Sequence, residues 1–163
     1  MSRGAFEPRT FYDLATHLKD RLLHTIPREL KQATDRTCIS RAYYAVFLSL
    51  RDKILALPFR DAELRRRIKH TNDAHAIVAE TIRIIDADVG DLIVNLRTLR
   101  NEADYRTDIA LPPDKVDQAF KIASEIFSKS ALVISKIKES DIISAWNKIQ
   151  RKRQGRHFYF RVM

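Results

Sequence analysis

The segment between Pro27 and Pro58 carries apolar side chains every three or four residues, the strongest periodic pattern in the chain. Such a spacing places the side chains on one face of an α-helix, because a helix turns once in 3.6 residues. Pro27 suits a first helical turn, and Pro58 cannot continue a helix. We therefore predict one long helix from Arg28 to about Leu57. Its apolar face consists of Ile39, Tyr43, Val46, Phe47, Leu50, Ile54 and Leu57.

Other segments repeat this helical pattern. We predict a first helix over residues 11–25, a third through residues 77–85 after a cap at Asn72 or Asp73, and a fourth over residues 91–105. A last helix starts at Pro113 or Asp114, passes Ile137 and continues in the same pattern to Ile149. Residues 86–90 are predicted to be a turn, and the basic residues 58–73 a short helix or a loop.

The scarcity of turn-forming residues sets the fold class. Only 3 glycines and 5 prolines occur in 163 residues, which disfavours an all-β fold with its many turns. The length suits one domain. We predict an all-α protein: an antiparallel four-helix bundle over residues 1–150, with a short extra helix near residues 60–70 and a basic, aromatic tail over residues 151–163.

The net charge of the chain bears on which kinds of partner it can bind. The formal net charge is +9 and the sequence pI is about 9.9. An anionic partner such as RNA or DNA is one interpretation, and a surface simply rich in Lys and Arg is the other. The single cysteine, Cys38, excludes a disulfide framework, and neither a long apolar run nor a secretory signal is evident. We expect a cytoplasmic protein.

The segment Asp91–Tyr105 has a second, polar stripe. Arg97, Arg100, Asn101 and Asp104 follow one another at helical spacing, opposite the apolar positions of the same helix. Two cations, an amide and a carboxylate on one face make this stripe the best candidate for a functional surface. The structural alternative is that Arg100 and Asp104 form an ordinary ion pair, or tie this helix to the second one.

Two segments together resemble a known family. Ser40–Phe47 (SRAYYAVF) is similar to the SRAYYAxF segment of prokaryotic HEPN proteins, and Arg100–Tyr105 (RNEADY) is similar to their RNxADY segment. The order and separation of the two segments also fit, and residues 75–78 are a weaker match. The resemblance covers roughly residues 10–135.

The resemblance implies a helical bundle that forms a homodimer. Many relatives, including the HepT-like toxins, cleave RNA and are paired with a nucleotidyltransferase-like antitoxin. In active HEPN ribonucleases an arginine and a polar residue precede a histidine, and two copies form one composite site. Arg100 and Asn101 match the start of that pattern, but positions 105, 106 and 107 hold Tyr, Arg and Thr.

The absence of the motif histidine leaves two hypotheses about function. Metal-free RNA cleavage needs a base and an acid near neutral pH, which histidine supplies and arginine does not. The first hypothesis is a toxin–antitoxin or defence-like HEPN protein that binds RNA at a dimer groove, with cleavage by Arg100, Asn101 and Tyr105 as its enzymatic form. The second is a non-catalytic dimeric module that docks a nucleotidyltransferase-type partner.

Under the first hypothesis each polar residue of the stripe has a role. Arg97, Arg100 and Asp104 would line the RNA site, and two copies of the arginines would bring four cations to a phosphate chain. Asn101 would orient the phosphate or sugar. Tyr105 would act as an unusual base, or would correspond to the tyrosine that receives nucleotide groups in some antitoxin-paired relatives. Neither a metal nor a cofactor is predicted.

Several residues are expected to be structural. Tyr43 and Tyr44 are predicted to pack in the core or at an interface, Cys38 to be a small buried residue, and Tyr105 to pack at the helix end. The tail combines five cations with three aromatic rings, which suits single-stranded RNA, a docking segment for a partner protein, or disorder. Its cations are Arg151, Lys152, Arg153, Arg156 and Arg161, and its rings are Phe158, Tyr159 and Phe160.

Overall fold

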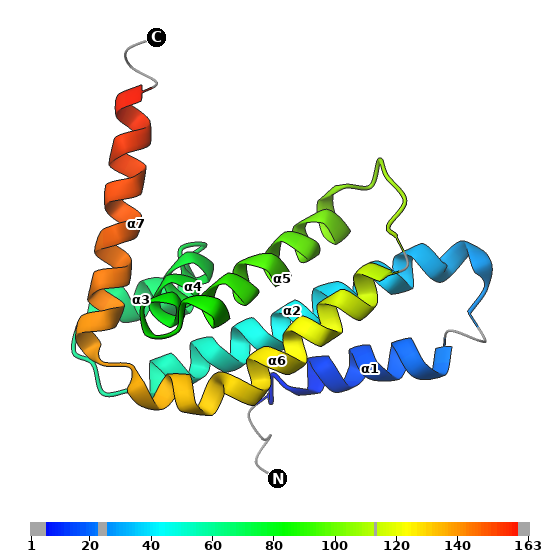
Figure 1. The fold of residues 1–163 in the computed structure, drawn as a ribbon, viewed down its shortest axis with the longest axis horizontal. Helices are drawn as coiled ribbons and strands as arrows, with labels where there is room; N and C mark the ends of the chain where they lie inside the picture. The colour runs from blue at the N-terminus through cyan, green and yellow to red at the C-terminus, as the bar shows by residue number, and fades with distance from the viewer. Residues whose placement is uncertain (1–5, 23–25, 113, 160–163) are drawn as a thin grey trace. The chain divides into compact units, whose positions relative to one another are not determined.

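The computed structural model describes residues 6–22, 26–112 and 114–159 (Figure 1). Throughout these ranges the regular structure is helical, which confirms the all-α class. The elements are α1 (Thr10–Leu22), the 3-10 turn η1 (Arg28–Leu30), α2 (Lys31–Ala56), α3 (Ala62–His70), α4 (Ala74–Ile85), α5 (Ala87–Tyr105), α6 (Asp114–Lys136) and α7 (Glu139–Tyr159). No helix in the described part of the chain is long and apolar enough to cross a membrane.

The chain forms two compact units, which we describe separately. Unit 1 comprises Met1–Ser49 and Leu92–Ser128, and unit 2 comprises Leu50–Asp91 and Lys129–Met163. Unit 1 therefore holds α1, the first part of α2, the second part of α5 and the first part of α6. Unit 2 holds α3, α4 and α7 with the remaining parts of those three shared helices.

Side-chain contacts join the four helical segments of unit 1. From α1, the ring of Tyr12 lies 5.3 Å from that of Phe120 and 5.5 Å from that of Phe127, both on α6. The thiol of Cys38 on α2 donates a 3.6 Å hydrogen bond to the carbonyl of Ala15 on α1. The largest fully buried side chains of this unit are Ile39, Tyr43, Ile93, Leu96 and Ile126. Burial of each contributes about 1.5–3 kcal/mol.

The C-terminal end of α5 is fastened to α2 by one arginine. The guanidinium of Arg36 donates hydrogen bonds to the carbonyls of Ala103 at 2.7 Å and Ile109 at 2.6 Å, and longer ones to Glu102 at 3.4 Å and Arg106 at 3.2 Å. The last carbonyls of a helix lack partners within the helix and carry partial negative charge. Arg36 supplies hydrogen-bond donors and a positive charge to these carbonyls. It thereby fixes the end of α5 against α2.

Unit 2 is built on α4, which packs against α3 and α7. Asp61 caps α3 by accepting a 2.9 Å hydrogen bond from the amide of Leu64. This confirms the short helix predicted near residues 60–70. The core of unit 2 includes Leu50, Ile54, Leu64, Ile68, Ile77, Ile82 and Ile142, each almost completely buried.

The junction between α4 and α5 corrects the predicted turn at residues 86–90. Only Asp86 is non-helical there, and its carboxylate accepts a 3.1 Å hydrogen bond from the amide of Val89 in the first turn of α5. Gly90 is needed for close approach, since a Cβ at this position would lie 2.6 Å from the Cα of Arg83. The glycine that suggested a turn instead lets α4 and α5 come together.

The last helix, predicted through Ile137 with a continuation toward Ile149, does not continue unbroken. α6 ends at Lys136 and α7 begins at Glu139. The carboxylate of Asp141 reaches back to accept a 2.8 Å hydrogen bond from the amide of Lys138, as in the second half of a capping box. An acidic residue three positions after Lys138 is the local signal for this start, and the apolar period across the break concealed it.

Other boundaries differ slightly from prediction. The second helix begins with η1 and becomes α-helical at Lys31. The first helix is observed to Leu22, and residues 23–25 of the predicted helix lie outside the described residues. α7 extends through Tyr159, so the first part of the predicted tail is helical. The side chains of residues 155–159, and residues 160–163 altogether, lie outside the described part, and the roles predicted for the tail stay predictions.

Candidate functional site

The two segments that carry the resemblance meet in unit 1. The side chain of Arg100 on α5 donates a 2.7 Å hydrogen bond from Nη2 to the hydroxyl of Tyr44 on α2. A weaker hydrogen bond of 3.4 Å runs from the hydroxyl of Ser40, which is buried, to Oδ2 of Asp104. Two segments more than 50 residues apart in sequence therefore form one cluster between α2 and α5.

Arg100 is the centre of this cluster. Its Nη1 donates hydrogen bonds to Oδ1 of Asn101 at 3.1 Å and to the hydroxyl of Tyr105 at 3.2 Å. The guanidinium lies 5.2 Å from the ring centroid of Tyr44 and 5.0 Å from that of Tyr105, which are cation–π distances. The side chain is 16% exposed, so it is largely covered but still open to solvent.

Asp104 supplies the opposite charge. Nε of Arg100 lies 2.7 Å from Oδ2 of Asp104, one helical turn later. The buried Nε–H has no acceptor along its bond, so this contact is an ion pair rather than a directed hydrogen bond. The structure thus realises both structural alternatives: Arg100 pairs with Asp104 along α5, and it ties α5 to α2 through Tyr44.

The donors of Arg100 are mostly in use. A guanidinium has five N–H bonds. Two on Nη1 go to Asn101 and Tyr105, and one on Nη2 goes to Tyr44. A bidentate contact with phosphate needs two neighbouring donors. Such a contact requires Asn101 and Tyr105 to release Nη1, and both are exposed residues at the end of α5, with Tyr105 67% exposed.

The charged state of Arg100 is secure. Burial by itself disfavours the charge and lowers the pKa, but the hydrogen bond to Tyr105 and the charges of its neighbours outweigh burial and hold the pKa above its ordinary value. Neighbouring Tyr43 is 1% exposed. Burial raises the pKa of its phenol, against the opposing charges of Arg97 and Arg100. Tyr43 is therefore a neutral core residue, as predicted, with its ring stacked on Phe47.

Arg97 lies outside the hydrogen-bonded cluster. It is half-buried one turn before Arg100, and no described residue pairs with it by a hydrogen bond or an ion pair. Its positive charge nevertheless acts on Tyr43, where it opposes the rise in the pKa of the phenol. Of the predicted site residues, Asn101, Asp104 and Tyr105 thus each contact Arg100, and Arg97 contributes charge alone.

Sequence reasoning assigned Tyr44 to packing and missed its hydrogen bond to Arg100. It also gave no role to Ser40 or Arg36, which hold Asp104 and the end of α5. A signal did exist for Tyr44, because a half-buried tyrosine hydroxyl normally finds a polar partner. The identity of that partner depends on how α2 and α5 are set against each other, which no local pattern specifies.

The chemistry available to the cluster is anion binding and charge stabilisation. None of the groups that contact Arg100 is a histidine: they are two tyrosine hydroxyls, an amide and a carboxylate. An arginine that keeps its proton cannot act as a general base. Within the described residues, no three His, Cys, Asp or Glu side chains lie together as metal ligands would.

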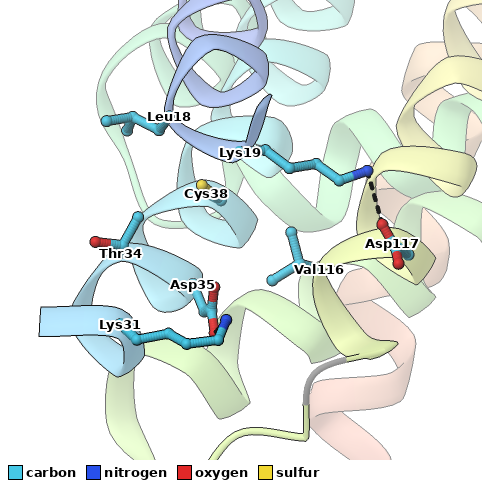
Figure 2. A pocket seen from close by; sticks show the side chains of 8 residues that line it. All are labelled: Leu18, Lys19, Lys31, Thr34, Asp35, Cys38, Val116 and Asp117. Atoms are coloured by element: carbon cyan, nitrogen blue, oxygen red, sulfur yellow. Dashed lines mark hydrogen bonds and ion pairs between the residues drawn. The ribbon is translucent and has the colours of Figure 1, made fainter. Parts of the chain in front are cut away.

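A separate cavity of about 170 Å³ lies among α1, α2 and α6 in unit 1 (Figure 2). Figure 2 shows Lys19 reaching from α1 to Asp117 on α6, where the two form a 2.7 Å ion pair. On α2, Lys31 pairs with the buried Asp35 at 2.9 Å. Burial raises the pKa of the Cys38 thiol to about 11, so this lining residue is protonated at neutral pH.

The cavity is therefore lined by groups that already satisfy one another, and the Arg100 cluster remains the better candidate site. Comparisons of this chain with models of protein families, with curated proteins and with solved structures found no match.

Proposed function

We propose that this protein is a HEPN-type member of a toxin–antitoxin or defence-like system and binds RNA in a groove between two copies of the chain. In this proposal the four helical segments of unit 1 correspond to the antiparallel HEPN bundle. The polar face of α5, with Arg97 and Arg100, lines the groove from each copy.

One observation carries the proposal. The segments Ser40–Phe47 and Arg100–Tyr105, which resemble HEPN motifs, contact each other through Tyr44 with Arg100 and Ser40 with Asp104. These contacts also tie α5 to α2, but they gather the polar residues of both segments at one place that is open to solvent. Such a shared polar cluster is the arrangement that the proposed site needs.

The cluster suggests how RNA is held. Arg97 offers an uncommitted guanidinium, and Arg100 offers Nη1 once Asn101 and Tyr105 turn outward. Tyr44 keeps the other side of the Arg100 guanidinium fixed, so the donor is presented in a defined orientation. Two copies bring four arginines to one groove, and neutralising phosphates in this way makes binding sensitive to salt.

A specific observation favours a second candidate function, the non-catalytic module. Asp104 pairs with Arg100, and no histidine among the described residues forms a hydrogen bond with Arg100. A surface of this kind suits docking of a nucleotidyltransferase-type partner better than it suits proton transfer. In this alternative the exposed Tyr105 belongs to the docking surface.

Assays of RNA cleavage and RNA binding distinguish these two candidate functions. The wild type, Arg100→Ala and the control Arg106→Ala would each be incubated with total RNA and with tRNA in EDTA. Arg106 is an exposed arginine of unit 1 that pairs with Asp108. Its replacement by alanine removes one positive charge, as Arg100→Ala does. Circular dichroism checks that each variant is folded.

The proposal expects salt-sensitive RNA binding that falls in Arg100→Ala and persists in Arg106→Ala. Cleavage by the wild type and by Arg106→Ala, but not by Arg100→Ala, would add ribonuclease activity to the function. Absence of RNA binding by the folded wild type would leave the docking module as the better account. Unfolding of Arg100→Ala would assign Arg100 to structure, and the milder Arg100→Lys would then test binding.

A further inference from the structure

The positive charge of the chain is unevenly divided between the two units. Unit 2 contains 17 Lys and Arg against 10 Asp and Glu, a net charge of +7, whereas unit 1 contains 13 against 11, a net charge of +2. The unit with the Arg100 cluster therefore carries little of the excess. Long-range attraction for an anionic chain must come chiefly from unit 2.

The excess lies in residues 129–163, with 9 Lys and Arg against 2 Asp and Glu, whereas residues 50–91 hold 8 of each. Basic side chains from residues 50–91 nevertheless gather around an open groove of about 400 Å³ in unit 2. The groove lies between the end of α2, at Leu55, and one side of α3 (labelled in Figure 1). The α3 side chains in it are Ala62, Arg65, Arg66, Lys69 and His70. We call it the α3 groove. None of its lining residues is acidic.

The four basic side chains of the α3 groove are not equally committed. Arg65 is fixed, since its Nη2 donates a 2.8 Å hydrogen bond to the carbonyl of Leu55 at the end of α2 and its guanidinium lies 4.8 Å from the ring centroid of Phe59. Arg66 forms a two-pronged pair with Glu63, with both distances 2.8 Å. Arg65 therefore shapes the groove, and Arg66 is already half neutralised.

Lys69 and His70 are exposed, and neither has a hydrogen bond or an ion pair with a described residue. Cations in the last turn of a helix do stabilise it through the helix dipole. That role does not require a concave surface free of acidic groups. Both features instead favour an anion that enters the groove.

We propose that the α3 groove is a second contact site for RNA, where Lys69, Arg66 and His70 bind the phosphate backbone. The inference rests on the proposed function for the nature of the ligand, but it assigns the main electrostatic contribution to unit 2 and not to Arg100. Contacts of this kind are independent of base sequence and position the chain without specifying it.

A phosphate backbone fits the α3 groove better than a lipid surface does. A membrane-binding face normally adds protruding apolar or aromatic side chains to its cations. The apolar groups of the α3 groove are only Leu55 and Ala62, and Leu55 is half-buried. A recess lined mainly by basic side chains suits a narrow, charged chain.

The test measures binding of a fluorescein-labelled oligouridylate by fluorescence anisotropy at several salt concentrations. Lys69→Gln is compared with Lys121→Gln, which removes an exposed lysine from α6 in unit 1 and changes the net charge equally. Loss of one backbone contact should lower the slope of log affinity against log salt by about 0.7, or about threefold in affinity change between about 50 and about 200 mM salt. Lys69→Glu should weaken binding further, and Lys121→Gln should match the wild type.

Each other outcome has a defined meaning. Equal losses in Lys69→Gln and Lys121→Gln would reduce the effect to net charge and overturn the inference. Loss of binding in Arg100→Ala with none in Lys69→Glu would place RNA on unit 1 alone, overturning the inference while the proposed function stands. Tighter, Lys69-dependent binding to phosphatidylserine vesicles than to the oligouridylate would assign the groove to a lipid headgroup. Loss in Lys69→Glu without loss in Arg100→Ala would support the α3 groove and count against the Arg100 site.

Discussion

Replacing Arg36 by alanine should destabilise the end of α5 that carries Asp104 and Tyr105. The guanidinium makes two short hydrogen bonds, to the carbonyls of Ala103 and Ile109, and two longer, weaker ones. A hydrogen bond to a charged group contributes about 1.5–3 kcal/mol when buried and much less when water can replace it. The bond to Ala103 is partly buried and that to Ile109 is exposed, and the cation adds about 0.3–1 kcal/mol against the helix dipole. We expect a total loss of about 2–3 kcal/mol.

Urea denaturation measures this loss, and hydrogen exchange locates it. At a dependence of about 1–3 kcal/mol per molar urea, the midpoint should fall by about 1–2 M, and amide protection should decrease first around residues 103–109. Arg36→Lys keeps the charge but not the fork of donors, so it should recover less than half of the loss. Arg106→Ala is the control for loss of an exposed arginine. A free energy of unfolding for Arg36→Ala within about 0.5 kcal/mol of the wild type would refute the role of Arg36 in fastening the end of α5.

Three further substitutions or reactions test neighbouring parts of the account. Tyr44→Phe removes the acceptor that fixes Arg100 and should cost about 1–2 kcal/mol in urea denaturation while weakening RNA binding; unchanged binding would show that Tyr44 does not position the arginine. Burial raises the pKa of the Cys38 thiol to about 11, so native protein at pH 8 should react with iodoacetamide about 100-fold more slowly than unfolded protein. The stability linked to this proton should be complete below about pH 9 and should be lost as the pH rises toward 11. Gly90→Ala forces a Cβ against the backbone of Arg83 and should lower the free energy of unfolding by about 1–3 kcal/mol, whereas a stabilised protein would disprove the close approach.

The sequence allowed the helices to be predicted, because the apolar period is a local property. The stripe of Ile39, Tyr43, Leu50 and Ile54 is buried as expected, and each of these residues is at most 1% exposed. The short helix over residues 62–70 also had a local signal in the cap at Asp61. Such features depend on neighbours within a few turns and need no knowledge of tertiary contacts.

Features that depend on tertiary contacts were missed. Gly90 reads as a turn residue, but its reason is the nearness of Arg83 on another helix. The cap was predicted at Asn72 or Asp73, and Asp73 does occupy the N-cap position of α4. Its carboxylate, however, makes no cap bond and accepts hydrogen bonds from Arg67 at 3.2 Å and Arg153 at 2.5 Å. The same holds for the partners of Arg100. The residues of the candidate site were named from their spacing, but their mutual contacts needed the structure.

The uneven charge of the two units could be predicted only in part, because the sequence shows a basic C-terminal stretch but not the unit to which it belongs. The net charge of +9 is a property of the composition, but the division into +7 and +2 depends on which segments pack together. Unit 1 draws its residues from two stretches that are far apart in sequence, and so does unit 2. The excess of unit 2 comes from one consecutive stretch, because residues 129–163 hold 9 Lys and Arg against 2 Asp and Glu, whereas residues 50–91 hold 8 of each.

The most direct test of the central claim is a disulfide cross-link across the proposed groove. Asn101→Cys places an exposed thiol beside Arg100. The native Cys38 is buried and protonated at neutral pH, so it should not form a cross-link. Mild oxidation of Asn101→Cys should give a covalent dimer of twice the 19.0 kDa chain mass, and prior binding of the oligouridylate should change its yield. Lys121→Cys, on α6, should remain monomeric in denaturing gels. A wild-type protein that sediments as a monomer at all concentrations, or equal cross-linking of both variants, would contradict a shared arginine groove.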